Sequence, residues 1–316
     1  MRILLANPRG FCAGVNMAIQ CVNEAIKIVG TPLYVYHEIV HNRHVVEQFV
    51  GQGVIFVDHL EDVPANATVI FSAHGVSPEV RREAVERGCT LIDATCPLVT
   101  KVHTEAIRYA RQGYKILLVG HAGHDEVVGT VGEAPEAITI VESPEDVDLL
   151  PFGPGERIAY LTQTTLSRDD ARRIIDAIEK RFPNVKPPPS DDICYATTNR
   201  QLAVHEFATD SDLVLVVGSR NSSNSLRLTE IARNAGTPAH LVDDVSEIDH
   251  QWFEGVETVL VTAGASAPEH LVTQIVSDLR RRYGDDVEEK LVVEEDMHFE
   301  LPADLRRLRA NAPANG

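Results

Sequence analysis

The sequence predicts an α/β protein built from three pseudo-equivalent small domains that each contain a mainly parallel sheet. Short apolar runs rich in Val, Ile and Leu alternate along the chain with amphipathic stretches of helical period. This alternation is typical of buried parallel strands that are connected by helices. Three cysteines also recur in similar turn-like contexts, each followed by polar loops in the same order. Such a recurrence indicates that one structural unit is repeated.

The apolar runs are the expected strands and the amphipathic stretches are the expected helices. Strands are predicted at residues 3–6, 54–57, 69–71, 116–119, 158–161, 213–217 and 259–261. Helices are predicted at residues 15–29, 78–87, 98–111, 168–181, 223–234 and 269–282, where apolar side chains recur at helical spacing. Residues 183–192 include a run of prolines, and proline lacks the N–H that a central strand needs. We therefore expect a linker there.

Cys12, Cys96 and Cys194 mark the three predicted units. The first two are 84 residues apart and the last two are 98 residues apart, which suits small domains. A polar residue follows each cysteine after 28 or 29 residues, namely His41, His124 and Ser222. Second polar loops follow at residues 72–75, 162–165 and 262–266. The spacing predicts domains at residues 1–95, 96–192 and 193–283, with a C-terminal extension at residues 284–316.

Composition narrows the class of protein. The chain has 316 residues, with 29 Lys and Arg against 47 Asp and Glu, and a formal net charge of −18. This charge opposes nucleic acid and anionic lipid as partners. The apolar N-terminal run is too short for a signal peptide and no run of 18 apolar residues occurs, so we expect a cytoplasmic protein with no membrane partner. Five cysteines, an odd number, do not suit a secreted disulfide framework.

Three thiolates that meet at one axis suit iron–sulfur or zinc chemistry. The ligand groups of parallel α/β sheets gather beyond the carboxyl ends of the strands, so three units facing one axis would bring the three cysteines together. The sequence has no CxxC spacing, which disfavours a zinc ribbon. A [4Fe–4S] cluster normally takes four cysteines, and with three ligands one iron keeps an open site. Cys21 and Cys89 are expected to be core residues, since free cysteine often behaves as a small hydrophobe.

Histidines and neutral donors predict a binding site for an anion such as phosphate. His41, His74 and His124 each follow a strand and precede a helix, where the helix dipole and free N–H groups favour negative charge. The neutral donors that would add to this site are Asn42, Ser72, Thr164, Thr165, Ser222, Ser223, Asn224 and Ser266. The acidic chain would thus bind an anion through local positive potential.

The segment GHAGHDE at residues 120–126 holds the candidates for acid–base catalysis. Glu126 is the stronger candidate and Asp125 the alternative, and the spacing alone does not choose between them. Residues 37–41 read HEIVH and match the HExxH pattern of zinc proteases. That chemistry needs both histidines on one face of a helix, whereas residues 33–36 predict a strand that runs directly into His37. We therefore reject the protease interpretation.

An ordered set of motifs resembles the 4-hydroxy-3-methylbut-2-enyl diphosphate reductases (the IspH/LytB family), from residue 3 to about residue 303. The motifs are PRGFCAG at 8–14, HEIVHN at 37–42, SAHGV at 72–76, DATCPLVTKVH at 93–103, GHDE at 123–126, TQTTLS at 162–167, CYATTNRQ at 194–201 and GSRNSSNS at 218–225. The resemblance implies a trefoil of three α/β domains around a central iron–sulfur cluster, as the repeat spacing independently suggests.

The resemblance also implies roles for individual residues. Cys12, Cys96 and Cys194 would hold a [4Fe–4S] cluster with one open iron site, and Glu126 and Thr164 would form the proton relay on the hydroxyl side. The diphosphate would be bound by His41, His74, His124, Ser222, Ser223, Asn224 and Ser266. The implied reaction is reductive dehydroxylation of an allylic diphosphate to isopentenyl and dimethylallyl diphosphates, the last step of the methylerythritol phosphate route. A reduced ferredoxin or flavodoxin would donate the electrons, and we expect a monomer.

Two features depart from the family pattern. Asn16-Met17 stands where the family usually has Asp-Arg, and Tyr36 replaces a common Arg. Both lie outside the ligand set, so we expect altered charge near the site without loss of activity. Two competing functions remain. One is a non-redox [4Fe–4S] hydro-lyase acting on a small anionic substrate. The other is an iron–sulfur sensor or carrier, which a fourth cysteine ligand would support.

Overall fold

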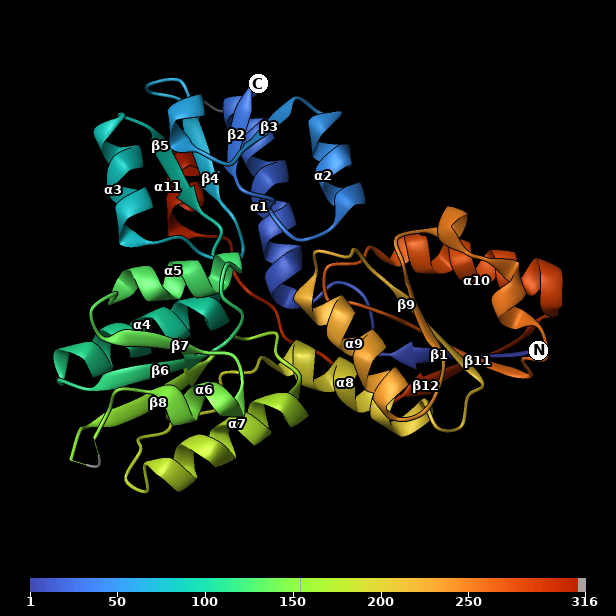
Figure 1. The fold of residues 1–316 in the computed structure, drawn as a ribbon. Helices are drawn as coiled ribbons and strands as arrows, with labels where there is room; N and C mark the ends of the chain where they lie inside the picture. The colour runs from blue at the N-terminus through green and yellow to red at the C-terminus, as the bar shows by residue number, and fades with distance from the viewer. Residues whose placement is uncertain (154, 312–316) are drawn as a thin grey trace. The chain divides into compact units, whose positions relative to one another are not determined.

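The computed structural model describes residues 1–153 and 155–311, and within them twelve strands form three sheets. The strands are β1 (Arg2–Asn7), β2 (Leu33–Tyr36), β3 (Val54–Val57), β4 (Thr68–Phe71), β5 (Thr90–Asp93), β6 (Lys115–Val119), β7 (Ile138–Val141), β8 (Ile158–Thr162), β9 (Leu213–Val217), β10 (Ala239–Val242), β11 (Thr258–Ala263) and β12 (Asp286–Leu291). Every strand pair in the three sheets is parallel. The α/β class with parallel sheets is therefore confirmed (Figure 1).

The helices connect the strands, as parallel pairing requires. They are α1 (Ala13–Val29), α2 (Arg43–Val50), α3 (Pro78–Glu86), α4 (Pro97–Arg111), α5 (Asp125–Glu133), α6 (Pro144–Leu149), α7 (Arg168–Arg181), α8 (Tyr195–Phe207), α9 (Ser223–Asn234), α10 (Glu269–Tyr283) and α11 (Ala303–Asn311). All the strands and helices predicted from the sequence are present, most of them shifted by a residue or two at their ends. No helix in the described part of the chain is long and apolar enough to cross a membrane.

The chain divides into two compact units. The first unit contains residues 1–13, 41–45 and 194–297, and it holds the sheet ordered β10-β9-β11-β1-β12. The second unit contains residues 14–40, 46–193 and 298–316, and it holds the sheets ordered β3-β2-β4-β5 and β7-β6-β8.

The three sheets share one strand order, and this order gives the predicted repeat a structural basis. In each sheet the first strand of the repeat lies between the second and the third, as β2 lies between β3 and β4. In two of the sheets a further strand pairs with the outer side of the third strand and leads to a cysteine. These strands are β1, which precedes Cys12, and β5, which precedes Cys96. The equivalent piece before Cys194 is a single bridge between Lys186 and Ala159, in the otherwise irregular linker.

The pairing of the first strand differs from the pairing that the predicted domain boundaries imply. The strand β1 falls within the predicted unit at 1–95, yet it pairs with β11 and β12. Its apolar residues fit equally well beside any buried parallel strand, so the sequence gives no sign of this long-range pairing. The predicted extension at 284–316 contributes β12 to the same sheet, and its helix α11 contacts β5. The boundaries at 95, 192 and 283 otherwise remain a prediction, and residues 312–316 lie outside the described residues.

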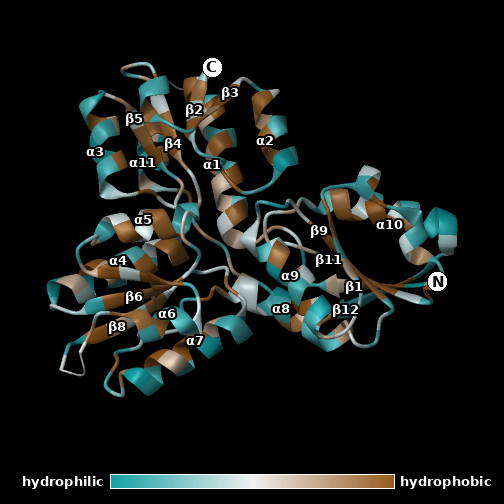
Figure 2. Cartoon of the chain, viewed as in Figure 1, coloured by the Kyte–Doolittle hydropathy of each residue, from teal (hydrophilic) through white to brown (hydrophobic). Residues whose placement is uncertain are grey.

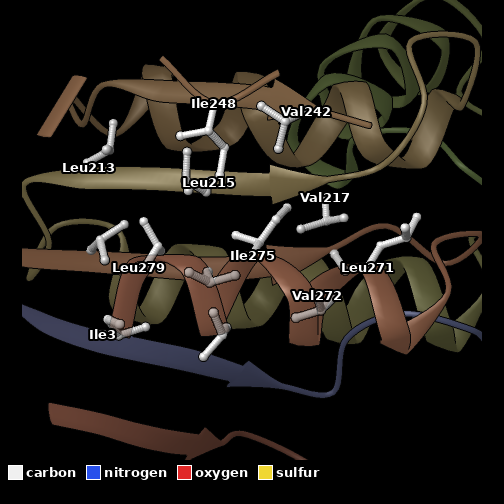
Figure 3. Close-up of a cluster of buried hydrophobic side chains, with 14 of the residues drawn as sticks. Ile3, Leu213, Leu215, Val217, Val242, Ile248, Leu271, Val272, Ile275 and Leu279 are labelled. Atoms are coloured by element: carbon white, nitrogen blue, oxygen red, sulfur yellow. The ribbon is translucent and has the colours of Figure 1, made fainter. Parts of the chain in front are cut away.

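In the first unit, helices cover both faces of the sheet. Side chains of β9 and β1, such as Leu215 and Ile3, pack against Leu271 and Ile275 of α10 on one face (Figure 3). On the other face Val214, Val216 and Leu4 pack against α8 and α9. Each fully buried side chain of this size contributes about 1.5–3 kcal/mol. The double coverage explains why β9 is an uninterrupted apolar run.

The second unit repeats this arrangement with shorter sheets. Leu117 and Tyr160 face α7, whereas Ile116 and Leu118 face α4. In the sheet β3-β2-β4-β5, the side chains on the face that includes Val69 pack against α3. The strands of both sheets are accordingly apolar along most of their length (Figure 2). These rigid sheets carry the polar loops at their carboxyl ends.

Candidate active site

In the first unit, Cys194 begins the helix α8. It is the N-cap residue, and its sulfur accepts a hydrogen bond from the Thr197 N–H at 3.4 Å and lies 3.2 Å from the Thr197 hydroxyl. The Thr197 hydroxyl in turn accepts from the Asn224 side chain at 3.4 Å. Hydrogen bonds to cysteine sulfur and the positive end of a helix both favour a negatively charged thiolate ligand.

Cys12 lies on a loop that is fastened to the same unit by backbone and side-chain contacts. Its N–H donates to the Ala265 carbonyl at 3.1 Å, and the next N–H, of Ala13, donates to the Tyr195 hydroxyl at 3.1 Å. Burial raises the pKa of Tyr195 to about 12, so this phenol remains a neutral hydrogen-bonding group. The loops of Cys12 and Cys194 are therefore joined directly within the first unit.

Arg200 strengthens this junction, and the sequence analysis missed it. Its side chain is fully buried on α8 and donates to the Gly10 carbonyl from Nε at 3.1 Å and from Nη2 at 2.7 Å. Its Nη1 forms an ion pair with Glu295 at 3.0 Å. The sequence signal was an arginine in the motif CYATTNRQ, which also fits an exposed helix position. The guanidinium fixes the backbone two residues before Cys12.

Hydroxyl groups gather at the N-terminus of α9 in the first unit. Ser222 is the N-cap and accepts from the Ser225 N–H at 3.3 Å, and its oxygen lies 3.4 Å from the Ser266 hydroxyl. Ser266 donates to the His41 carbonyl at 2.8 Å. Ser223 and Asn224 occupy the first turn of the helix, and Asn224 accepts from the Ala265 N–H at 2.9 Å. Ser222, Ser223 and Asn224 thus lie at the N-terminus of α9, a favourable place for phosphate, with Ser266 and the His41 backbone beside them.

In the second unit, Glu126 and Thr164 form a buried pair. Only 2% of Glu126 and 4% of Thr164 is exposed. One carboxylate oxygen accepts from the Thr164 N–H at 2.6 Å and the other from the Thr164 hydroxyl at 2.8 Å. Burial raises the pKa of Glu126, and the opposing hydrogen bonds from Thr164 do not cancel this effect. The pair has the features of a proton donor that stays protonated above the usual range of a carboxylic acid.

The histidines of this unit lie beside the Glu126 helix. His124 is the N-cap of α5 and accepts from the Glu126 N–H at 3.2 Å. The rings of His74 and His124 lie 6.0 Å apart, edge to face. Asp125 lies 2.8 Å from the His37 Nδ1 and 3.9 Å from the His74 Nδ1. The two neighbouring carboxyl groups therefore have different partners, Glu126 a threonine and Asp125 two histidines.

Cys96 occupies the N-cap position of α4 in the second unit, and its N–H donates to the Ala73 carbonyl at 3.0 Å. This contact links Cys96 to the loop that carries His74. Each of the three predicted ligands thus lies at or immediately before a helix N-terminus, because Cys12 directly precedes α1. Their convergence at one point remains a prediction.

The other two cysteines occupy different environments. Cys21 is fully buried within α1, and burial raises the pKa of its thiol to about 12. Cys89 is partly buried and packs on the core beneath α3. None of the five cysteines, all of which lie among the described residues, forms a disulfide bond. A thiol that does not ionise is a poor metal ligand, which agrees with a structural role for Cys21.

The structure agrees with the rejection of the zinc-protease interpretation. Residues 37–42, which follow β2, are not helical, and α2 begins only at Arg43. His37 adopts a left-handed backbone with φ 59°. The ring of Tyr36, one of the departures from the family pattern, stacks on His37 at 4.2 Å. The hydrogen bond to Asp125 raises the pKa of His37, so Tyr36 covers one face of a histidine that favours its charged form.

The chain was compared with known proteins. The model of the LytB protein family matches residues 3–280. The chain belongs to this family. A Rhodopirellula baltica protein named 4-hydroxy-3-methylbut-2-enyl diphosphate reductase is 54% identical over 99% of this chain and 98% of the relative. A Hahella chejuensis protein of the same name is 56% identical over 97% of this chain and 98% of the relative. The resemblance noted from the motifs is thus confirmed.

Solved structures give the same result. The E-1-hydroxy-2-methyl-but-2-enyl-4-diphosphate reductase from Plasmodium falciparum matches with a TM-score of 0.96 and 40% identity, covering 98% of both chains. A second structure, described as the terminal enzyme of the non-mevalonate pathway, matches with a TM-score of 0.64 and 31% identity, covering 89% of this chain and all of the other. Membership of the LytB family implies an iron–sulfur cofactor.

Proposed function

We propose that this chain is an iron–sulfur reductase that removes the hydroxyl group of (E)-4-hydroxy-3-methylbut-2-enyl diphosphate. The products are isopentenyl and dimethylallyl diphosphates, and the step ends the methylerythritol phosphate route to isoprenoids. The observation that carries the proposal is the buried Glu126–Thr164 pair beside His124 and His74, in a chain of the LytB family. A proton donor beside histidines suited to a phosphate group supports this proposal.

The residues present fit an iron–sulfur cluster. Cys12, Cys96 and Cys194, all in the described part of the chain, form no disulfide bond, are partly exposed and lie at helix starts, whereas Cys21 is buried and its thiol pKa is raised. We propose that these three cysteines hold a [4Fe–4S] cluster with one open iron site. When bound, such a cluster supplies electrons and a Lewis-acidic site for a substrate oxygen.

The diphosphate would be bound by the two polar groups described above. In one unit the N-terminus of α9 presents the hydroxyls of Ser222 and Ser223 and the side chain of Asn224, with Ser266 beside them. In the other unit His74 and His124 lie together. His41, whose carbonyl accepts from Ser266, would complete the set. Neutral donors, helix ends and protonated histidines bind an anion without a cluster of lysines and arginines.

The reaction breaks the C–O bond of the allylic alcohol and forms a C–H bond. It consumes two electrons and two protons and releases water. Glu126 would supply the proton that lets the hydroxyl leave as water, and the Thr164 hydroxyl, 2.8 Å from the carboxylate, would orient the substrate hydroxyl toward it. The second proton goes to the allylic carbon skeleton. A reduced ferredoxin or flavodoxin would supply the electrons to a monomeric, cytoplasmic enzyme.

The test is an anaerobic assay of the reconstituted protein with the allylic diphosphate and reduced methyl viologen. We expect oxidation of the dye together with formation of both isomeric diphosphates. Turnover that needs no electron donor would contradict the reductase and support the non-redox hydro-lyase. Absence of any turnover by fully iron-loaded protein would contradict both functions.

Replacing Ser222 by Ala separates substrate binding from helix capping. We expect the KM for the diphosphate substrate to rise by about three- to tenfold, the effect of one neutral hydrogen bond. The cap is lost as well, at a cost of about 1 kcal/mol in the free energy of unfolding. Ser143→Ala is the matched control, because Ser143 caps α6 by accepting from the Asp146 N–H, also at 3.3 Å. It should destabilise the protein to a similar extent and leave KM unchanged, as urea unfolding and steady-state kinetics would show.

A further inference from the structure

His103 lies at the centre of a buried polar network in the second unit. It is on α4 and only 3% of it is exposed. Its Nδ1 is 3.0 Å from the Glu133 carboxylate, and Arg81 donates to the same oxygen at 2.8 Å. Burial alone would raise the pKa of Glu133, but the hydrogen bonds from His103 and Arg81 hold it below its ordinary value. Glu133 is therefore charged and fixes one edge of the imidazole ring.

The other edge of the ring lies against Gly75. A Cβ atom at Gly75 would meet the His103 Cε1 at 3.0 Å and Nε2 at 3.3 Å, and Gly75 itself has φ 79°. A Cβ at Gly129 of α5 would lie 3.4 Å from the Gly75 carbonyl group and from the same His103 carbon. His103 Nε2 has no hydrogen-bond partner among the described residues. The free edge of the ring therefore serves as a packing surface for Gly75.

This contact joins the loop of one sheet to a helix of the other. Gly75 directly follows His74 in the loop after β4, whereas Gly129 lies one turn after Glu126 on α5. The backbone of the loop is also linked to the predicted cluster ligands, since the Cys96 N–H donates to Ala73. His103 thus contacts the loop next to His74. A displacement of the loop at this point would move His74 relative to His124 and Glu126.

We propose that His103, oriented by Glu133 and Arg81, is a positioning residue that holds the His74 loop against the Glu126 helix. Buried ionisable networks contribute little net stability, because desolvation opposes the attraction. Such a network orients the imidazole ring better than contacts with an apolar side chain would. The inference rests on the proposed function, in which His74 binds the diphosphate.

His103→Asn tests the proposal. The Asn amide can still donate to Glu133 from near the position of Nδ1, but it lacks the part of the ring that contacts Gly75. We expect KM for the substrate and Kd for inorganic diphosphate to rise about tenfold, in the range for outer partners of a binding residue, with kcat little changed. Hydrogen exchange should quicken at residues 73–76 and stay unchanged along α4. Unchanged affinities and exchange, or faster exchange throughout α4, would overturn the proposal.

Gly75→Ala changes the other residue of the same contact. Its matched control is Gly113→Ala, because Gly113 has φ 76° and nothing within 4 Å of a Cβ at that position. Both variants carry the same backbone strain, and only Gly75→Ala presses on the His103 ring and, at 3.2 Å, on the Thr95 methyl group. We expect Gly75→Ala alone to weaken inorganic diphosphate binding about tenfold. Equal affinities in the two variants would contradict the proposal. Diphosphate binding needs no turnover, whereas failure of the wild-type assay would count against the proposed function itself.

Discussion

Glu126→Gln should lower kcat/KM for the allylic diphosphate by about 10²–10⁴-fold, the usual contribution of general acid catalysis, while bound iron stays at the wild-type level. Gln has the shape of Glu: its amide oxygen can accept from the Thr164 N–H as Glu126 does at 2.6 Å, and its NH2 group can donate to the Thr164 hydroxyl, which lies 2.8 Å from the Glu126 carboxylate. It has no proton to release. Anaerobic kinetics and iron analysis of the same sample would measure both quantities.

Asp125→Asn is the matched control, because it changes the neighbouring carboxyl group in the same way. Asp125 lies 2.8 Å from the His37 Nδ1, whereas Thr164 donates its hydrogen bonds to Glu126. We expect only a small loss of kcat/KM. A greater loss from Asp125→Asn than from Glu126→Gln would assign the proton donor to Asp125.

The pH dependence of both activity and stability follows from the raised pKa of Glu126. Because burial raises this pKa, the wild-type rate should fall as the pH rises through it, and the Gln variant should lack this limb. The free energy of unfolding should also fall as the pH rises through this pKa. The protonated carboxyl group contributes stability below its unfolded pKa of about 4.3, and this contribution is lost as the pH rises. Glu126→Gln should therefore unfold at a higher temperature than wild type at alkaline pH but not at acidic pH.

The sequence predicted the buried part of the fold well, because burial on both faces leaves a direct signal. The run at residues 213–217 contains only Leu and Val and becomes β9, an interior strand of its sheet. The strand β12 was missed for the opposite reason. Its sequence DVEEKL is mostly charged and exposed, and it pairs with β1 from the far end of the chain at an edge of the sheet. Edge strands of this kind lack a hydrophobic pattern.

The candidate site was predicted in part for a similar reason. Residues that follow a strand and begin a helix, such as His124 and Ser222, have a recognisable sequence context. The spacing alone did not choose between Asp125 and Glu126, and the resemblance implied Glu126; the contact that distinguishes the two carboxyl groups comes from Thr164, 38 residues later. Arg200 and His103 lie within helices and act through partners distant in sequence, Glu295 and Glu133. Both lie within motifs of the family resemblance, at 194–201 and 93–103, but those motifs do not say which partners their side chains contact.

Cys12→Ser, Cys96→Ser and Cys194→Ser should each lose most of the bound iron and sulfide and all but a trace of reductase activity. Each replaces a thiolate at a helix start with a hydroxyl that does not ionise in the accessible pH range. The matched controls are Cys21→Ala and Cys89→Ser. Burial raises the pKa of the Cys21 thiol to about 12, and Cys89 packs on the core beneath α3. Both controls should keep their iron and activity after anaerobic reconstitution.

The controls also decide between the reductase and an iron–sulfur carrier. A cluster with three cysteine ligands leaves one iron different from the others, and anaerobic Mössbauer spectra should show that iron responding to added substrate. If Cys89→Ser lost its iron as the three predicted ligands do, a fourth cysteine would close the cluster and the substrate would have no iron to approach. That outcome would favour a carrier. If Cys12→Ser instead kept full iron and activity, the ligand set itself would be wrong, because the proposed chemistry requires all three thiolates.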